Sequence, residues 1–175
     1  AALAELGARL TRDGVEFLRI AIDIAAHSRM LEPILEDYRA FLASIPLAPP
    51  QMEIISNRSG EALRAEEATD PEYWVGQLRN TVRFDDCLRH LGAKADRVFL
   101  EVGPGKALSA LAGMQPAVKP GQVLSSLRHP EDKTEDDAHF LRIIGRLWAA
   151  GVEADWDQIW GNARRNRVVL PSYAF

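Results

Sequence analysis

The chain has 175 residues, a hydrophobic fraction of 47%, a charged fraction of 26% and a formal net charge of −4. This composition is typical of a globular protein with one sizeable domain or two small ones. The negative charge and the lack of a dense Lys/Arg stripe argue against nucleic-acid binding. No apolar run reaches the roughly 18 residues of a membrane span, so we expect no membrane contact. The single cysteine, Cys87, cannot form an internal disulfide, and we expect a reducing, cytoplasmic location.

The N-terminal part predicts a helix followed by a strand. Leucines recur at helical spacing at Leu3, Leu6 and Leu10, and Gly14 is a typical helix stop. Residues Val15 to Ile24 are rich in β-formers, so we expect a strand there. The chain starts without Met and within helical sequence, so we expect it to be a piece of a longer polypeptide.

Further elements are expected between residues 28 and 92. Pro33 is compatible with a helix after His27 because it lies near the first turn. Met52 to Ser56 predicts a short strand and Asn57 to Gly60 its turn. Asp70-Pro71 is a typical helix start, with Asp as N-cap and Pro at the first helical position. Apolar residues at helical spacing define the other helices: Leu31, Ile34, Leu35, Tyr38, Phe41 and Leu42 in one, and Phe84, Cys87, Leu88 and Leu91 in the next.

Strands and helices alternate again in the C-terminal half. Arg97 to Val102 is an apolar run of the buried-strand type, and Val123 to Leu127 predicts a second strand. Between them we expect a helix that carries Leu108, Leu111 and Ala112. After Pro130 come a polar linker and an amphipathic helix with the apolar residues Phe140, Ile143, Ile144, Leu147 and Trp148. The alternation predicts an α/β layer architecture with a largely parallel sheet.

His27 is the candidate general base. It follows a predicted strand and precedes a helix, which places an imidazole at the carboxyl edge of a sheet, where ligands bind; a lone histidine can also be structural. No serine stands in the G-x-S-x-G frame of a nucleophile elbow, so the chain has a base without a nucleophile. Cys87 lies on an apolar helical face and is a core residue in our interpretation. The other histidines are scattered, and we expect no metal site.

The segment Glu101-Val102-Gly103-Pro104-Gly105 is interpreted as a tight strand-to-helix turn. A phosphate-binding loop is disfavoured, because Leu108 stands where G-x-G-x-x-G requires a third glycine. The glycines then serve the backbone conformation of the turn, and the motif has an architectural role.

Three segments resemble the acyltransferase domain of modular type I polyketide synthases. They are Asp23-Ile24-Ala25-Ala26-His27-Ser28, Asp70-Pro71-Glu72-Tyr73-Trp74 and Phe99-Leu100-Glu101-Val102-Gly103-Pro104-Gly105. The resemblance covers nearly the whole chain and implies an α/β fold in three parts. Residues 1–22 would end a ferredoxin-like small subdomain, 23–130 would form the C-terminal part of an α/β-hydrolase-like large subdomain, and 131–175 would be the linker that follows the domain.

The resemblance also implies a Ser–His ping-pong acyl transfer. A serine upstream of this chain would receive a malonyl-type group from coenzyme A and pass it to the phosphopantetheine thiol of an acyl carrier protein. His27 would be the base, and the backbone carbonyl of Gln77 would orient it, with Asp23 as the alternative acceptor nearest in sequence. No cofactor is expected to be bound: acyl-CoA is a substrate, and the phosphopantetheine belongs to the carrier protein.

Substrate choice is expected at Ile24, Ala25 and Ala26, just before His27. Family members that select malonyl usually read His-Ala-Phe-His there, and those that select methylmalonyl read Tyr-Ala-Ser-His. This chain matches neither. One methyl group changes discrimination by only about 1–3 kcal/mol, so the extender unit stays open between malonyl and a branched relative.

The partners implied are the N-terminal half of the acyltransferase domain, the ketosynthase and linker of the same synthase, the acyl carrier protein and a CoA thioester. The tail Leu170-Pro171-Ser172-Tyr173-Ala174-Phe175 resembles an element that runs toward the ketosynthase. Two alternatives stay open. One is a catalytically inert docking fragment, favoured by the missing nucleophile. The other is a fatty-acid-type malonyl transferase, against which the long stretch after Pro130 argues.

Overall fold

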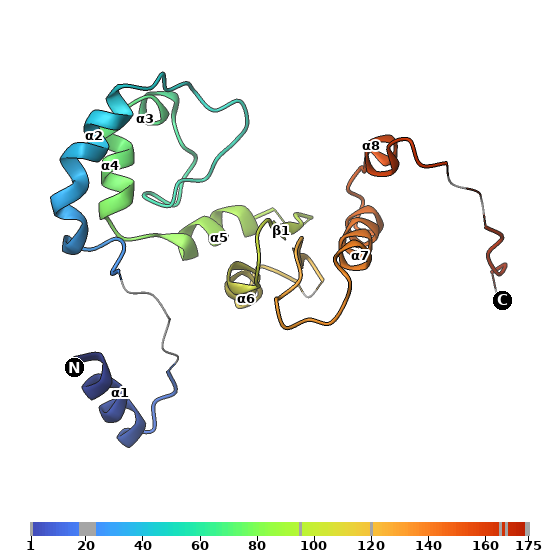
Figure 1. Ribbon diagram of the computed structural model, residues 1–175, viewed down its shortest axis with the longest axis horizontal. Coiled ribbons are helices and arrows are strands. Elements are labelled where there is room, and N and C mark those ends of the chain that lie inside the picture. Colours follow the sequence, from blue (N-terminus) through green and yellow to red (C-terminus); the bar gives the residue numbers. More distant parts are fainter. Residues whose placement is uncertain are drawn as a thin grey trace. The chain divides into compact units, whose positions relative to one another are not determined.

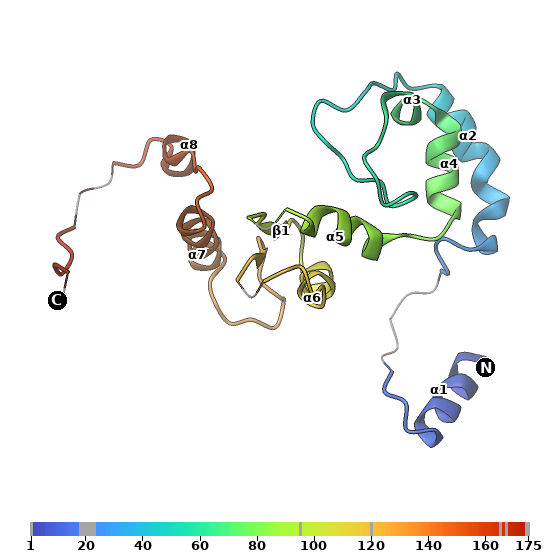
Figure 2. The ribbon, with the colours of Figure 1, turned by 180° about the vertical axis from the view of Figure 1, so that it is seen from behind.

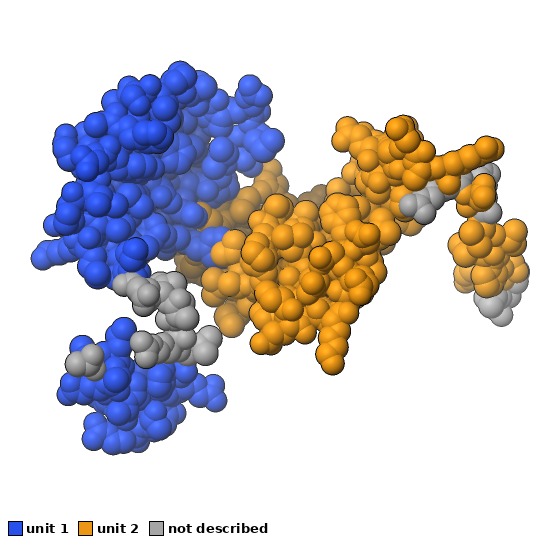
Figure 3. All heavy atoms as spheres, viewed as in Figure 1, with its two compact units in different colours: residues 1–84 blue, residues 85–175 orange. Residues whose placement is uncertain are grey.

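The computed structural model describes residues 2–17, 24–94, 96–119, 121–164, 166 and 168–173. The chain divides into two compact units, Ala1–Phe84 and Asp85–Phe175, shown in blue and orange in Figure 3. The resemblance implies a division into three parts, with boundaries after residues 22 and 130. This division differs from the two compact units and stays a prediction. In the described part of the chain, no helix combines the length and the apolar character that a membrane span needs.

The first unit begins with helix α1 (Ala2–Arg12), as the leucine spacing predicts. Gly14 follows the helix with a φ of 68°, a left-handed conformation that suits a helix stop. Residues 15–17 of the predicted strand have no regular structure, and most of that strand, residues 18–23, lies outside the described residues.

The helix expected after His27 is split into two pieces. A 3-10 helix, η1 (Arg29–Ile34), comes first, and α2 (Leu35–Ala43) continues the chain. The proline at position 33 lies inside η1. It has no N–H to donate, which favours a separate short helix with the α-helix beginning after it. Leu31 and Leu42 are the buried residues of these two helices.

The predicted strand at residues 52–56 is wrong as an element and is reduced to one antiparallel bridge between Ile55 and Ala62. The turn predicted at residues 57–60 is present, closed by hydrogen bonds of 2.8 Å from Gly60 N–H to the Ser56 carbonyl and from Ser56 N–H to the Glu61 carbonyl. The return segment enters helix α3 (Ala65–Ala68) within a few residues, which leaves no length for a strand ladder.

Helix α4 (Pro71–Arg79) is the element that carries the candidate site. Its start is the one predicted: the Asp70 side chain accepts a 2.9 Å hydrogen bond from Glu72 N–H. Helices α2 and α4 lie side by side in both views (Figures 1 and 2), and Arg39 on α2 pairs with Glu72 on α4. A small core of Leu63, Ala68 and Tyr73, with Trp74 against it, supports the helix.

The second unit is built on a parallel strand pair. Strands β1 (Phe99–Glu101) and β2 (Val123–Ser125) pair with Leu100 opposite Leu124. Helix α6 (Ala107–Gly113) connects them and packs on both. Helix α5 (Phe84–Gly92) precedes β1 and buries Cys87 and Leu88. The parallel pairing and the predicted order of these elements are confirmed.

The chain continues into α7 (Asp136–Ala149) and α8 (Trp156–Trp160). The amphipathic pattern predicts α7, whereas α8 is not expected from the sequence analysis. Asp155 caps α8 by accepting a hydrogen bond of 2.9 Å from Gln158 N–H, and the rings of Trp156 and Trp160 stack with centroids 6.2 Å apart. Residues 168–173 have no regular structure, and Val169 is 97% exposed.

Candidate active site

His27 has an unusual backbone. Its φ is 57°, and it is the one non-glycine residue in the described part of the chain with a positive φ. The left-handed region is costly for a residue with a Cβ, and such outliers gather at functional sites. The next residue holds the conformation: the Ser28 hydroxyl donates to the Ala25 carbonyl at 2.6 Å and accepts from Met30 N–H at 3.2 Å. Ser28 is therefore engaged as the cap of η1.

The imidazole of His27 meets the end of helix α4. Its Nδ1 lies 3.2 Å from the backbone carbonyl oxygen of Gln77, although the two residues are 50 positions apart. Because a carbonyl only accepts hydrogen bonds, Nδ1 carries the proton in this contact. The neutral ring then has its lone pair on Nε2, which is the tautomer required of a general base.

Helix geometry explains why Gln77 can accept this bond. The backbone ladder of α4 ends with the 2.9 Å hydrogen bond from Asn80 N–H to the Gly76 carbonyl. The carbonyl of Gln77 lies beyond that last bond, among the acceptors that a helix C-terminus leaves without intrahelical partners. This end of the helix also carries the negative pole of its dipole, which favours an N–H donor there.

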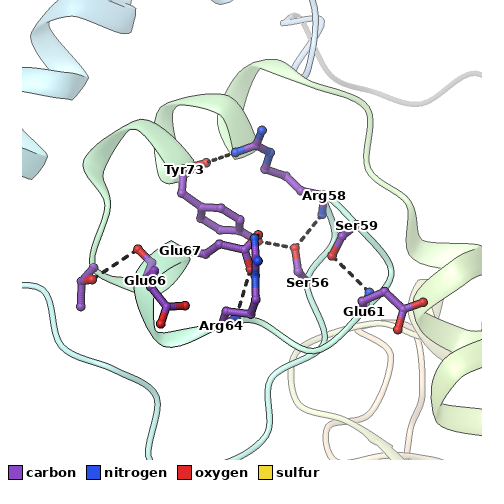
Figure 4. Close-up of polar contacts among 9 residues, drawn as sticks. Ser56, Arg58, Ser59, Glu61, Arg64, Glu66, Glu67 and Tyr73 are labelled. Carbon is purple, nitrogen blue, oxygen red and sulfur yellow. Dashed lines mark hydrogen bonds and ion pairs between the residues drawn. The ribbon is translucent and has the colours of Figure 1, made fainter.

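Several contacts that the sequence analysis did not identify support helix α4. Arg58 donates to the Tyr73 carbonyl at 3.1 Å and lies 4.9 Å over the Tyr73 ring. Figure 4 shows this guanidinium against the helix, with Ser56 beside the Tyr73 hydroxyl. A Cβ at Gly76 would lie 2.9 Å from the Arg58 Nη1, so a residue without a side chain admits this approach. No periodic pattern signals these contacts.

The remaining predicted site residues are not brought into this contact. Ile24, Ala25 and Ala26 are exposed, Ile24 by 60%. Asp23, the alternative acceptor, lies outside the described residues. The assignment of a specificity role to residues 24–26 therefore stays a prediction.

Cys87 and Glu101 have other roles. Burial, together with the charge of Asp86, raises the pKa of the Cys87 thiol, which disfavours the nucleophilic thiolate. The Glu101 carboxylate accepts from Leu108 N–H at 3.1 Å and from Ser109 N–H at 2.8 Å, at the start of α6. The motif around Glu101 thus joins β1 to α6, in accord with an architectural role. The described residues contain no group of three or more His, Cys, Asp or Glu placed to hold a metal ion.

Comparison with known proteins identifies the class. The family model of the acyl transferase domain matches residues 1–154, and the chain belongs to this family. Among curated proteins it is similar to a phenolphthiocerol/phthiocerol polyketide synthase component of Mycobacterium tuberculosis, with 34% identity over 172 residues. That match covers 95% of this chain and 11% of the relative. Polyketide synthase GfsB of Streptomyces halstedii is 36% identical over 178 residues, which cover 99% of this chain and 3% of that protein.

Solved structures agree. The acyl transferase domain of ZmaA matches with a TM-score of 0.81 and 30% identity, over 97% of this chain and 39% of that chain. The acyltransferase domain from the second module of the salinomycin polyketide synthase matches with a TM-score of 0.76 and 30% identity, over 98% and 40% of the two chains. The relatives are modular polyketide synthases, as the sequence resemblance predicts, and the α/β fold class is confirmed. The chain spans about two fifths of these domains and about a tenth or less of the synthases.

Proposed function

We propose that this chain supplies the general base of an acyltransferase that moves a malonyl-type extender unit from coenzyme A to the phosphopantetheine thiol of an acyl carrier protein. One observation carries the proposal: His27 Nδ1 is held 3.2 Å from the Gln77 carbonyl, and its Nε2 is left as the basic atom. Membership of the acyl transferase family supports the reaction class.

The nucleophile in this proposal is a serine outside the chain. The family structures are about two and a half times longer than the part matched here, so the remainder of the domain has room to provide it. His27 Nε2 takes the serine proton as the serine oxygen attacks the thioester carbonyl, and it returns a proton to the leaving CoA thiolate. In the second half-reaction, the same nitrogen takes the proton of the phosphopantetheine thiol as it attacks the acyl-serine. It then returns that proton to the serine oxygen.

A carbonyl in the orienting position has a chemical consequence. It fixes the tautomer and the ring plane, as a carboxylate does in a Ser-His-Asp triad. It carries no full charge, so it stabilises the imidazolium less than a carboxylate would. The helix dipole of α4 adds a partial negative charge at the same place.

The finer assignments belong to this proposal. Ile24, Ala25 and Ala26 line the approach to the base, and the extender unit is malonyl or a branched relative. The partners are the remainder of the acyltransferase domain, the ketosynthase and linker of the same synthase, and the carrier protein. A second candidate, an inert docking fragment, is favoured by the exposed apolar tail, where Val168, Val169 and Leu170 are 79%, 97% and 78% exposed.

Intact mass spectrometry tests the proposal. The acyltransferase domain that contains this chain is incubated with malonyl-CoA or methylmalonyl-CoA, as wild type, His27→Ala and Gln77→Ala. We expect an acyl adduct in the wild type, and a rate at least 100-fold lower in His27→Ala, since general-base catalysis contributes about 10²–10⁴-fold. Gln77→Ala keeps the backbone carbonyl, so it should acylate within a few fold of wild type. Equal acylation of the wild type and His27→Ala would refute the role of His27.

The docking alternative has its own outcome. In that case the intact domain acquires no adduct from either thioester, while the chain still binds the ketosynthase or the carrier protein in a pull-down. An adduct with one thioester only would identify the extender unit.

A further inference from the structure

We propose that Glu32 and Arg79 are positioning residues that hold the His27 imidazole on the Gln77 carbonyl. The inference deepens the proposed function and rests on it for its catalytic meaning. Nothing in the sequence pattern or in the family match assigns a role to either residue. The structure places them as a bridge between the two elements that must meet for the histidine contact to form.

The geometry of the bridge is direct. Arg79 Nη2 lies 2.8 Å and Arg79 Nε 3.2 Å from Glu32 Oε1. Glu32 is in η1, five residues after His27, and Arg79 is the last residue of α4, two residues after Gln77. The pair therefore joins the same two short segments as the His27–Gln77 contact, five residues further along the chain on one side and two residues on the other.

The His27 contact needs such a constraint. It is a single hydrogen bond with a donor–acceptor distance of 3.2 Å, at the long end of the usual range. Each residue advances a helix by about 1.5 Å along its axis, so a slide of α4 by one residue would remove the carbonyl from reach. A fork of two N–H groups on one carboxylate oxygen has a defined geometry, so it opposes such a slide in addition to side-chain packing.

The contacts form a closed circuit. Ser28 ties His27 to η1 through its two hydrogen bonds. Glu32 ties η1 to Arg79, and the helical backbone ties Arg79 to Gln77. Gln77 then accepts from His27, which closes the circuit. If the Glu32–Arg79 member is removed, α4 and η1 are joined at this end by packing and by the weak histidine bond itself.

The exposure of the pair indicates that it contributes little to overall stability. The side chains of Arg79 and Glu32 are 27% and 54% exposed, and ion pairs this close to solvent stabilise proteins only slightly. Arg79 also lies at the C-terminus of α4, where a cation is favoured by the helix dipole. The helix dipole therefore favours an arginine at this position, and the hydrogen bonds to Glu32 determine the direction of its side chain.

The chain contains a matched control for this idea. Arg39 on α2 pairs with Glu72 in the first turn of α4. This is also a partly exposed Arg–Glu pair that joins α4 to a neighbouring helix, but it lies at the end of α4 away from Gln77. Glu72→Gln makes the same chemical change as Glu32→Gln without touching the circuit.

The first test is a tautomer measurement on the full chain. With ¹⁵N-labelled histidine, NMR distinguishes the Nδ1-protonated from the Nε2-protonated neutral ring of His27. We expect Nδ1–H to dominate in wild type and in Glu72→Gln, and its ratio to Nε2–H to fall at least fivefold in Glu32→Gln. The charge-swapped variant Glu32→Arg with Arg79→Glu should restore the wild-type ratio. An unchanged ratio in Glu32→Gln, or an equal fall in Glu72→Gln, would overturn the inference.

The second test is kinetic and uses the acyltransferase domain that contains the chain. Glu32→Gln should lower kcat for acylation several-fold and leave KM for the acyl-CoA unchanged, because a positioning residue acts through His27 and not on the substrate. A rise in KM with constant kcat would contradict a positioning role. Failure of the proposed function is separately visible: His27→Ala would then acylate normally, whatever tautomer the NMR spectrum reports for the wild type.

Discussion

Glu101→Gln should loosen the start of helix α6. The Glu101 carboxylate accepts two backbone hydrogen bonds there, from Leu108 and Ser109. A hydrogen bond to a charged group contributes about 1.5–3 kcal/mol to stability when it is well buried, and Glu101 is only partly buried. Discounting for solvent, we expect the loss of the charge to cost about 1–2 kcal/mol. That is a roughly 5- to 30-fold faster amide exchange at Leu108 and Ser109.

The same contacts make this part of the structure sensitive to acid. Partial burial opposes ionisation of Glu101, but hydrogen bonds from the Ser109 hydroxyl and from the Ser109 and Leu108 N–H groups outweigh it and lower the pKa of Glu101 below 4.5. A lowered pKa in the folded state means that the stabilisation is complete above about pH 4.5 and is lost as the pH falls through the lowered value.

Hydrogen exchange measures both effects. Exchange rates at Leu108 and Ser109, corrected for the intrinsic pH dependence, are compared between pH 3 and 6 for wild type, Glu101→Gln and the exposed control Glu153→Gln. The wild type and the control should lose protection below pH 4.5, while Glu101→Gln is already less protected at pH 6 and changes little. If Glu101→Gln matched the wild type across this range, the carboxylate would not be the cap of α6.

Three further predictions concern the N-cap of helix α4, the Tyr73 side chain and the Cys87 thiol. Asp70→Ala removes the N-cap of α4 and should destabilise it by about 1 kcal/mol, measured as faster amide exchange in its first turn. Tyr73→Phe removes the hydroxyl paired with buried Ser56 and should lower the free energy of unfolding by about 1 kcal/mol. Tyr73→Ala opens a cavity and should lower it by about 3–5 kcal/mol. Urea unfolding followed by fluorescence measures both values. Because burial and the charge of Asp86 raise the pKa of the Cys87 thiol, its reaction with dithionitrobenzoate at pH 8 should be at least tenfold slower in the folded chain than in urea, and an equal rate would show that the site is open.

Local sequence signals located most of the elements. Asp70 and Pro71 marked the start of α4, because N-capping and the fixed φ of proline depend on neighbouring residues alone. In α5 and α7, apolar residues recur at helical spacing because one face of each helix is buried. Prediction failed where pairing with another segment of the chain decides the secondary structure. The strand expected at residues 52–56 has only one bridged pair because its return segment turns into α3.

The candidate site divides in the same way. His27 and Gln77 were predicted as a base and its orienting acceptor, because the local segments that contain them resemble segments of a known family. Their contact spans 50 positions and depends on where α4 ends and on the left-handed backbone at His27. Arg58 against Gly76, and Glu32 with Arg79, carried no pattern that could be read in advance.

The sequence by itself determined the family, the parallel α/β order and the choice of His27 as the candidate base, because capping, hydrophobic period and motif residues are properties of neighbours in the chain. Only the tertiary structure decided which nitrogen of His27 carries the proton and which ion pair joins η1 to α4. These depend on the relative position of two helices to within about one 1.5 Å helical step. That position results from the packing of many side chains together, and no single segment of the sequence specifies it.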